Sequence, residues 1–566
     1  MPLNKEQFAE LIAQKADPKM SKQAFQTLKQ RVAHQLALTH VPKNTEILFA
    51  LKKKDRERLH TLLVSKPTRT MSGVAPVAIM SAPIACPPQA LCTYCPGGPK
   101  SIFGDVPKSY TDGAPAVKRA IRNKYDPYLQ VFNRLEHYHL LNQCPTKVEL
   151  IVMGGTFPSF EKAYRDVFIA RALQAMNDFS TMFYTQKGTL DETKFRDFFL
   201  LDLSYADKER EKIIIKRMEA LRDLKKPTVL DEQTNNETAR IRCIALVIET
   251  RPDCATQKEI DEMLRYGTTR AEIGVQSLRD HVLKRIKRGH DVATTITATQ
   301  ELRDALFKIT YHMMVGLPET TKETDIQEGK QLFDDPRFRP DSLKVYPCMV
   351  MAGTPLYEEY KKKLFTPVTT DEAMERIIEW KKTIPEYCRI MRVQRDLPTY
   401  MTEAGVDKTN LRQLMHNKKI VCRCIRCREP KEQTVDFDNV TTKVITYEAS
   451  GGTECFIAKE DVTNDLLLGY ARLRIPFKPV RKEITSTSAG IRELHVFGTA
   501  LDMQKKPTKE VQHRGLGKEL MEEAEKLARE TYDKKKMVVI AGLGVREYYK
   551  KQLQYIQEGP YVSKKI

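Results

Sequence analysis

The stretch ACPPQALCTYCPGG, residues 85–98, brings Cys86, Cys92 and Cys95 close together in the chain. Three thiolates at this spacing can hold three irons of a cubane [4Fe–4S] cluster and leave the fourth iron open for a substrate or cofactor. Two alternatives are a zinc knuckle without its fourth ligand and three unrelated buried thiols. The tyrosine before the last cysteine and the Pro-Gly-Gly turn after it favour the cluster.

The composition bounds the class of protein. A chain of 566 residues with 41% hydrophobic content is long enough for about two to four globular domains. No stretch approaches the roughly 20 apolar residues of a membrane span, and the N-terminus has no apolar signal core. Twelve clustered cysteines indicate reduced, metal-binding thiols and therefore a cytoplasmic protein. The net charge of +20 favours a nucleic-acid partner, although a generally basic proteome would give the same charge.

Residues 1–70 are predicted to form a basic helical segment. Apolar side chains such as Phe8, Leu11 and Ile12 recur at helical spacing, and Lys and Arg outnumber Asp and Glu by more than two to one. A basic run begins at Lys52. A solvated helix face would explain such a run, but together with the overall charge it favours contacts with RNA phosphates.

Between residues 71 and 390, short apolar runs alternate with amphipathic segments, which is the pattern of βα units around a parallel sheet. Six such units suit an α/β fold with a partial barrel. The charged segment 178–240 lacks this pattern and is predicted to be a helical excursion of unassigned function. The predicted strands are residues 74–80, 147–155, 243–250, 271–277, 309–317 and 342–350.

Glycines and polar residues stand at the ends of several predicted strands. Loops at the carboxyl ends of barrel strands carry the chemistry, so we expect a site there. A glycine pair permits close approach of the backbone to a ligand such as the amino end of a nucleoside cofactor. Buried polar residues at strand ends can also satisfy only one another. The residues singled out are Gly154, Gly155, Glu249, Arg251, Gln276 and His312, with Glu272, Ser277 and the turn Arg288-Gly289-His290 in the same set.

The linker, residues 391–439, contains Cys422, Cys424 and Cys427. Three thiols within six residues fit a tetrahedral zinc site that needs one more ligand. Free structural cysteines are the alternative. The candidates for the fourth ligand are Cys348, Cys388, His416 and Cys455.

Residues 440–566 follow a different pattern, with strands predicted at 465–475, 491–498 and 537–544. Between them, the turn Gln512–Gly517 opens a predicted helix, and the amides of such a glycine turn can bind a pyrophosphate. Its Q-x-x-G-x-G form is that of the acetyl-CoA loop in GCN5-type acetyltransferases. Tyr548 and Tyr549 follow where that fold often keeps a tyrosine near the thioester sulfur, although both could be core residues.

Taken together, the two halves resemble the catalytic subunit of Elongator, a tRNA wobble-uridine modification enzyme, over nearly the whole chain. The linker cysteines and the lone chain are similar to archaeal or bacterial members, which act without the other Elongator subunits; a homodimer is left open. The phrases that carry the resemblance are YCPGGP (94–99), KRAIRNKYDPY (118–128), MGGTF (153–157), IETRPD (248–253), EIGVQS (272–277), RGH (288–290), HMMVGLP (312–318), VRKE (480–483), RELHVFG (492–498) and VREYYKK (545–551).

The resemblance implies a partial (β/α)6 radical SAM barrel, then a GCN5-related acetyltransferase α/β domain, with a helical basic N-terminal segment. It implies that Cys86, Cys92 and Cys95 hold the [4Fe–4S] cluster with S-adenosylmethionine on the open iron. The 5′-deoxyadenosyl radical would take hydrogen from the acetyl methyl of acetyl-CoA. The carbon radical would add to C5 of uridine 34 in tRNA, and thioester hydrolysis would leave a carboxymethyl group, which makes the protein an acyltransferase.

The resemblance, together with the motifs above, also assigns residues. Lys162 matches a position that contacts acetyl-CoA from the radical domain, and Lys162, Tyr548 and Tyr549 are the catalytic candidates. The candidate S-adenosylmethionine ligands are Gly154, Gly155, Glu249, Arg251, Gln276 and His312. The acetyl-CoA candidates are Lys162, Glu493, Leu494, His495, Val496, Gln512, Arg514, Gly515, Leu516, Gly517, Lys518 and Tyr548.

Two other functions compete with this one. The first is a protein lysine acetyltransferase whose cluster only stabilises the fold. Such an enzyme usually needs a carboxylate base near the amine, and Glu493 is the attractive candidate. The second is a tRNA-binding scaffold without catalysis, against which the complete set of cluster cysteines and the acetyl-CoA loop argue.

Overall fold

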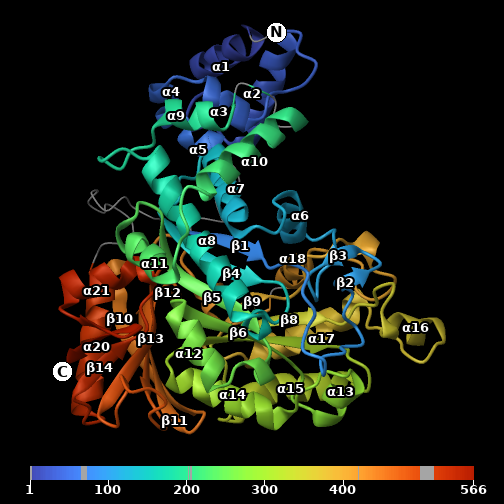
Figure 1. Cartoon of the computed structure of the whole chain (residues 1–566), viewed down its shortest axis with the longest axis vertical. Coiled ribbons are helices and arrows are strands. Elements are labelled where there is room, and N and C mark those ends of the chain that lie inside the picture. The colour runs from blue at the N-terminus through green and yellow to red at the C-terminus, as the bar shows by residue number, and fades with distance from the viewer. Residues whose placement is uncertain are drawn as a thin grey trace.

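The structure is a computed structural model of the chain. It describes residues 3–64, 73–201, 203, 207–418, 420–431, 433–497 and 515–566. Figure 1 shows an N-terminal group of helices, a curled sheet wrapped by helices, and a second sheet at the C-terminal end of the chain.

The N-terminal helices pack around a small core of their own. Phe8, Ile12, Phe25 and Leu59 are buried in it. Ser21 begins one helix, because its hydroxyl accepts a hydrogen bond from the amide of Ala24 at 3.1 Å. The helices are α1 (Leu3–Lys15), α2 (Lys22–Gln35), α3 (Asn44–Ala50), α4 (Lys53–Arg58) and α5 (His60–Leu63).

The first sheet has seven parallel strands, and its two edge strands do not pair with each other, so it forms a half-barrel (Figure 1). The six predicted strands are all present. The seventh, β9, was not predicted because its four residues, RIMR, contain only two apolar side chains. In spatial order the strands are β1 (Val74–Met80), β4 (Lys147–Met153), β5 (Arg242–Thr250), β6 (Thr268–Gln276), β7 (Lys308–Val315), β8 (Ser342–Pro347) and β9 (Arg389–Arg392).

Helices follow the strands and cover the sheet. The charged segment after β4 is helical, as predicted, and its aromatic rings pack against α7; Phe132 and Phe179 lie 5.0 Å apart between centroids. A short hairpin, β2 (Gly98–Ser101) and β3 (Gly104–Val106), follows β1. The helices are α6 (Pro115–Arg122), α7 (Pro127–Leu140), α8 (Lys162–Phe183), α9 (Glu192–Phe198), α10 (Lys208–Arg222), α11 (Val229–Thr238), α12 (Gln257–Arg265), α13 (Asp280–Arg285), α14 (Val292–Asp304), α15 (Lys322–Asp334), α16 (Pro355–Lys361) and α17 (Thr370–Thr383).

The second sheet is mixed, with β13 and β14 parallel and its other pairs antiparallel. The three predicted strands correspond to β12, β13 and β14. The linker before the sheet contributes α18 (Leu411–Asn417) and α19 (Ile425–Arg428). The elements of the sheet are β10 (Val440–Ala449), β11 (Gly452–Asp461), β12 (Leu466–Ile475), β13 (Ser488–Val496), α20 (Leu516–Glu530), β14 (Lys536–Val539), α21 (Arg546–Leu553), β15 (Ile556–Glu558) and β16 (Tyr561–Lys565).

The second sheet packs onto the amino ends of the barrel strands. One face buries Ile457 and Leu473 against α20, while Phe456 and Tyr470 on the other face join the core of the barrel. A Cβ atom at Gly542 would lie 1.8 Å from the carbonyl oxygen of Ile244 in β5, so only glycine fits there. Within the described ranges, no helix is both long and apolar enough to cross a membrane.

Candidate functional site

The cysteine loop, residues 85–98, follows β1 at the carboxyl ends of the strands. Each thiol meets a different hydrogen-bonding group. Cys86 Sγ lies 3.7 Å from the hydroxyl of Thr156, Cys92 Sγ accepts from Arg288 Nη1 at 3.4 Å, and Cys95 Sγ accepts from the amide of Ser109 at 3.2 Å. The three thiols therefore contact three different segments: the turn after β4, the turn after α13 and the turn after β3.

The thiols of Cys86 and Cys92 differ in the charges that surround them. Burial raises the pKa of Cys86, and the neighbouring Cys95 and Cys92 thiols raise it further. Burial also acts to raise the pKa of Cys92, but the Arg288 guanidinium outweighs it and the pKa is lowered. Nη1 of Arg251, whose charge acts on both Cys86 and Cys92, is likewise buried and has no hydrogen-bond partner in the described chain. Buried cationic donors beside three thiols fit an anionic group with acceptor atoms, such as an iron–sulfur cluster.

The predicted glycine pair lies next to the cysteine loop. Gly154 and Gly155 have φ angles of +119° and +103°, which other residues rarely adopt. A Cβ atom at Gly155 would lie 3.8 Å from Cys86 Sγ. Of the other strand-end residues, Arg251 bonds to Asp253 at 2.9 and 3.0 Å, and Gln276 ends β6 with a φ of +74°.

Glu249 and His312 lie deeper, in a polar network inside the barrel. Glu272 accepts from His312 Nε2 at 2.9 Å and also pairs with Lys344, whose ammonium reaches Glu249 at 3.4 Å. Glu249 in turn accepts from the hydroxyl of Tyr110 at 2.9 Å. Burial and the Lys344 charge lower the pKa of His312. These groups form hydrogen bonds and ion pairs with one another. This is the structural alternative to a ligand-binding role that the sequence leaves open for buried polar residues at strand ends.

Sequence reasoning missed Lys344 and Tyr110. Lys344 interrupts the apolar run of β8, and a lysine in a buried strand is a signal that needs a partner. Ligand atoms of Glu249, Glu272 and His312 lie within 4.8 Å of one another, but the Lys344 ammonium already supplies the positive charge there.

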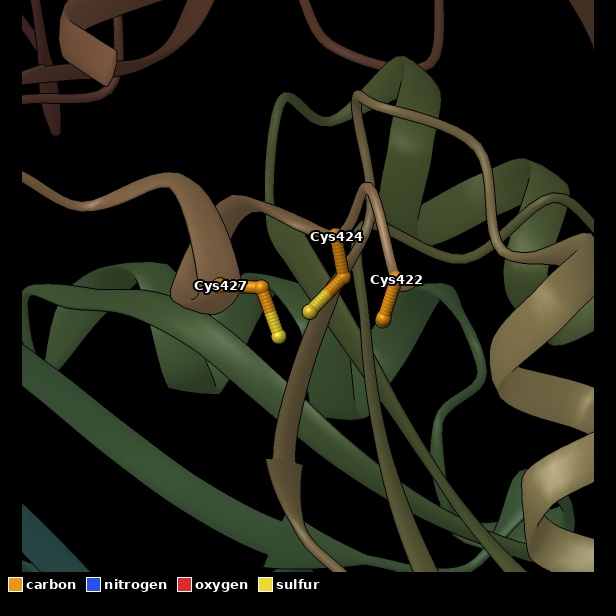
Figure 2. A group of neighbouring side chains, drawn as sticks. All are labelled: Cys422, Cys424 and Cys427. Carbon is orange, nitrogen blue, oxygen red and sulfur yellow. The ribbon is translucent and has the colours of Figure 1, made fainter. Parts of the chain in front are cut away.

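The linker cysteines, Cys422, Cys424 and Cys427, gather at the start of α19, and their Sγ atoms all lie within 4.8 Å of one another (Figure 2). A tetrahedral zinc ion with Zn–S bonds of about 2.3 Å holds its sulfurs about 3.8 Å apart, which this group can match. Hydrogen bonds from the other two thiols lower the pKa of Cys424 to about 2. The group is compatible with a metal ion or a cluster.

Two of the four predicted candidates for a fourth ligand lie elsewhere. Cys455 lies in β11 of the second sheet and contacts the hydroxyl of Tyr532 at 3.4 Å, and Cys348 is buried in a hydrophobic cluster with Tyr94. Cys388 lies beside the group: its carbonyl accepts from the amide of Ile425 at 3.0 Å, and its thiol interacts electrostatically with Cys424.

The backbone of the acetyl-CoA candidates on β13, and the first turn of α20, lie where β13 and β14 separate. The two strands pair from Ser488 to Ile491, after which β13 stays paired only with β12 through Val496. The first turn of α20 lies at this split, because a Cβ atom at Gly517 would be 3.7 Å from Val496 Cγ2 and 3.4 Å from the Tyr548 hydroxyl. The turn begins at Gly515, in the left-handed region with a φ of +85°.

Other predicted residues are distributed differently. Tyr548 is 37% exposed, whereas Tyr549 is buried in the core beneath α20. Lys162 begins α8, is 57% exposed, and pairs with Asp166 at 2.7 Å. Gln512 and Arg514 lie outside the described residues. Leu494 and Val496 pack on the side of α20, and Leu516 and Lys518 belong to the first turn of that helix.

Glu493 and His495 face the barrel instead. Glu493 pairs with Lys308 at the start of β7 and accepts from Arg472 Nε at 3.0 Å. Burial acts to raise the pKa of Glu493, but Lys308 and Arg472 outweigh it and hold the pKa well below its usual range. Burial lowers the pKa of His495 to about 4, and its ring stacks on Tyr470.

Known families and relatives match most of the chain. Residues 6–71 match the ELP3 N-terminal domain, residues 202–327 the radical SAM superfamily, and residues 340–420 the radical SAM C-terminal domain. A tRNA uridine(34) acetyltransferase of Methanocaldococcus infernus is 42% identical over 537 residues, covering 93% of this chain and 92% of the relative. Elongator complex protein 3 of Saccharomyces cerevisiae is 38% identical over 544 residues, with 94% and 89% covered.

The chain belongs to the Elongator complex protein 3 family. The solved structure of Methanocaldococcus infernus Elp3 with an N-terminal deletion agrees, with a TM-score of 0.70 at 39% identity over 88% of this chain and 100% of that one. The radical SAM domain of this family member implies an iron–sulfur cluster and S-adenosylmethionine. Its matched segment begins at residue 202 and so does not include the cysteine loop.

Proposed function

We propose that this member of the Elongator complex protein 3 family is a radical SAM acyltransferase that places a carboxymethyl group, derived from acetyl-CoA, on C5 of uridine 34 in tRNA. The observation that carries the proposal is the cysteine loop: it lies at the carboxyl ends of a parallel half-barrel, where the Arg288 guanidinium donates to the Cys92 thiol and the glycine pair approaches the Cys86 thiol. The printed names of the relatives, which include tRNA uridine(34) acetyltransferase, point to the wobble uridine as the acceptor.

The two cysteine groups suit different metals. In a cubane each cysteine binds its own iron, so the thiolates stand further apart than on one ion. Among the described residues, the thiols of the linker cysteines lie within 4.8 Å of one another, whereas those of the cysteine loop do not form such a group. We therefore assign the [4Fe–4S] cluster to Cys86, Cys92 and Cys95 and zinc to the linker. When bound, the cluster and S-adenosylmethionine supply a 5′-deoxyadenosyl radical.

The second sheet suits acetyl-CoA, as a GCN5-related domain would. The unpaired edge of β13 from Glu493 to Val496 offers backbone donors and acceptors, and the amides at the start of α20 suit a pyrophosphate. Tyr548 lies at the same split and is the better of the two tyrosines for contact with the thioester, because Tyr549 is in the core.

Glu493 is poorly suited to lysine acetylation. A general base must take a proton near neutral pH. The carboxylate of Glu493 is instead held by Lys308 and Arg472, and its pKa is well below its usual range. This favours an RNA acceptor over a lysine, as do the net charge of +20 and the excess of Lys and Arg in the N-terminal helices.

Anaerobic reconstitution tests the proposal. The protein is incubated with reductant, S-adenosylmethionine, acetyl-CoA labelled in the acetyl group, and tRNA with uridine 34, without any other Elongator subunit. We expect label in the tRNA at uridine 34. Cys92→Ala should abolish the product and the cluster absorption, whereas Cys144→Ala, a change at a cysteine outside both groups, should preserve them. Label on lysines but never on uridine, with Cys92→Ala fully active, would refute the proposal.

A further inference from the structure

Arg288 connects the barrel wall to the cysteine loop. Its side chain is buried, and its guanidinium donates from Nη2 to the carbonyl of Gly274 in β6 at 2.6 Å and from Nη1 to Cys92 Sγ at 3.4 Å. Because one end of this planar fork is fixed by the sheet, the direction of the N–H group toward the sulfur is fixed as well.

The backbone around Arg288 is built to hold this contact. The amide of Thr93 donates to the carbonyl of Ile286 at 3.0 Å, which ties the cysteine loop to the turn before Arg288. A Cβ atom at Gly289 would lie 2.4 Å from the carbonyl of Gln89, and one at Gly274 would lie 2.4 Å from Arg288 Nη2. Glycine at these two positions lets the guanidinium approach the loop.

Cys92 is the thiol with a cationic hydrogen-bond donor. Within the described chain, Cys86 meets a neutral hydroxyl and Cys95 a backbone amide. The nearby Arg251 pairs with Asp253 through two bonds and is not hydrogen-bonded to a thiol, whereas Arg288 has no carboxylate in an ion pair among the described residues. The positive charge of Arg288 is therefore directed at Cys92.

We propose that Arg288 is a positioning residue that raises the reduction potential of the cluster assigned to the cysteine loop; this inference rests on the proposed function. Reduction adds one electron from an external low-potential donor, without making or breaking a bond or moving a proton. The added negative charge lies partly on the thiolate sulfurs, so a buried cationic donor to one of them stabilises the reduced cluster more than the oxidised one.

A redox titration of the reconstituted cluster, followed by electron paramagnetic resonance without tRNA or acetyl-CoA, tests the inference. We expect Arg288→Gln to disfavour reduction at least about tenfold, which is about 59 mV for a one-electron couple. Arg288→Lys keeps the positive charge, so its reduction potential should lie between those of Arg288→Gln and the unmodified protein. Arg285→Gln, one turn away in α13 and paired with Glu359, is the matched control and should leave the potential unchanged.

An Arg288→Gln protein with full iron content and an unchanged potential would overturn the inference. If that variant does not retain a cluster, Gly274→Ala displaces the guanidinium while leaving the arginine in place, and an unchanged potential in that variant would overturn it equally. Because no tRNA or acetyl-CoA is present, the potential is measured whether or not uridine is modified. A protein that modifies no uridine but shows the shift would contradict only the proposed function.

Discussion

Replacing Asp341 with Asn tests whether buried ion pairs hold the second sheet on the barrel. Asp341 precedes β8 and is fully buried. It accepts from Arg492 Nη1 and Nη2 at 2.8 and 2.6 Å and from the amide of Ile309 at 2.8 Å, and Arg472 Nη1 lies 3.4 Å away. Burial acts to raise the pKa of Asp341, but the two arginines outweigh it and hold the pKa well below its usual range.

The expected cost follows from what the asparagine leaves behind. Its amide nitrogen donates, so one of the two Arg492 donors would face another donor, and one positive charge would lose its partner in the interior. Breaking a buried pair in this way costs about 3–5 kcal/mol. Glu454 also accepts from Arg492 at 2.9 Å and retains part of the compensation. We therefore expect a loss at the lower end, about 3 kcal/mol.

Chemical unfolding followed by fluorescence measures this loss. Trp380 in α17 is the single tryptophan of the chain and reports on the barrel. Glu379→Gln removes a partly exposed pair with Lys382 and should change the free energy of unfolding by less than about 1 kcal/mol. A double-mutant cycle between Asp341→Asn and Arg492→Gln should give a clear coupling energy. A loss below about 1 kcal/mol for Asp341→Asn, without coupling, would refute the reasoning.

Three other substitutions test other parts of the molecule. Burial raises the pKa of Glu328 to about 7, so between about pH 4.5 and 7 the folded state keeps a proton that the unfolded state releases. The free energy of unfolding should therefore fall by about 3 kcal/mol as the pH rises through this range. Glu328→Gln should lack this fall in urea unfolding; an unchanged pH dependence would contradict the shift. Gly329→Ala would place a Cβ atom 2.3 Å from Trp380 and should cost about 1–3 kcal/mol in urea unfolding. Gly517→Val narrows the split beside Tyr548 and should weaken acetyl-CoA binding in calorimetry without changing the unfolding midpoint; equal affinity would argue against that site.

The barrel could be predicted because its strands carry a strong local signal. In a parallel sheet covered on both faces, each strand reads as a nearly continuous apolar run, and six of the seven did. Two of the missed strands of the second sheet, β10 and β15, have weaker patterns. β10 is an edge strand whose residues from Thr441 to Val444 are all exposed, and β15 has only three residues. Exposure and shortness both remove the apolar signal.

The candidate site could be predicted only in part, because its contacts are distant in the sequence. Cysteine spacing is local, so both metal hypotheses came directly from it. The partner of Glu249 is Tyr110, 139 residues earlier, and Lys344 reaches Glu249 from 95 residues later. No spacing rule connects such positions. The orientation of Glu493 toward the barrel depends likewise on how the second sheet packs, which only the folded chain determines.

The polar interior of the barrel has a cost that a purely structural core would avoid. Barrels are commonly filled by branched apolar side chains, whereas here Arg270 bridges Glu149 at 2.7 Å and Glu272 at 3.0 Å beneath Lys344. In a low-dielectric interior each of these charges is favourable only while its partner stays in place, so the set tolerates little displacement. Glu249, which also pairs with Lys344, accepts a hydrogen bond from the hydroxyl of Tyr110, fifteen residues after Cys95. The residue before Tyr110 is Ser109, whose amide donates to Cys95 Sγ, so the charges help to place this end of the cysteine loop relative to the strands. A hydrophobic filling is non-directional and would not specify that position.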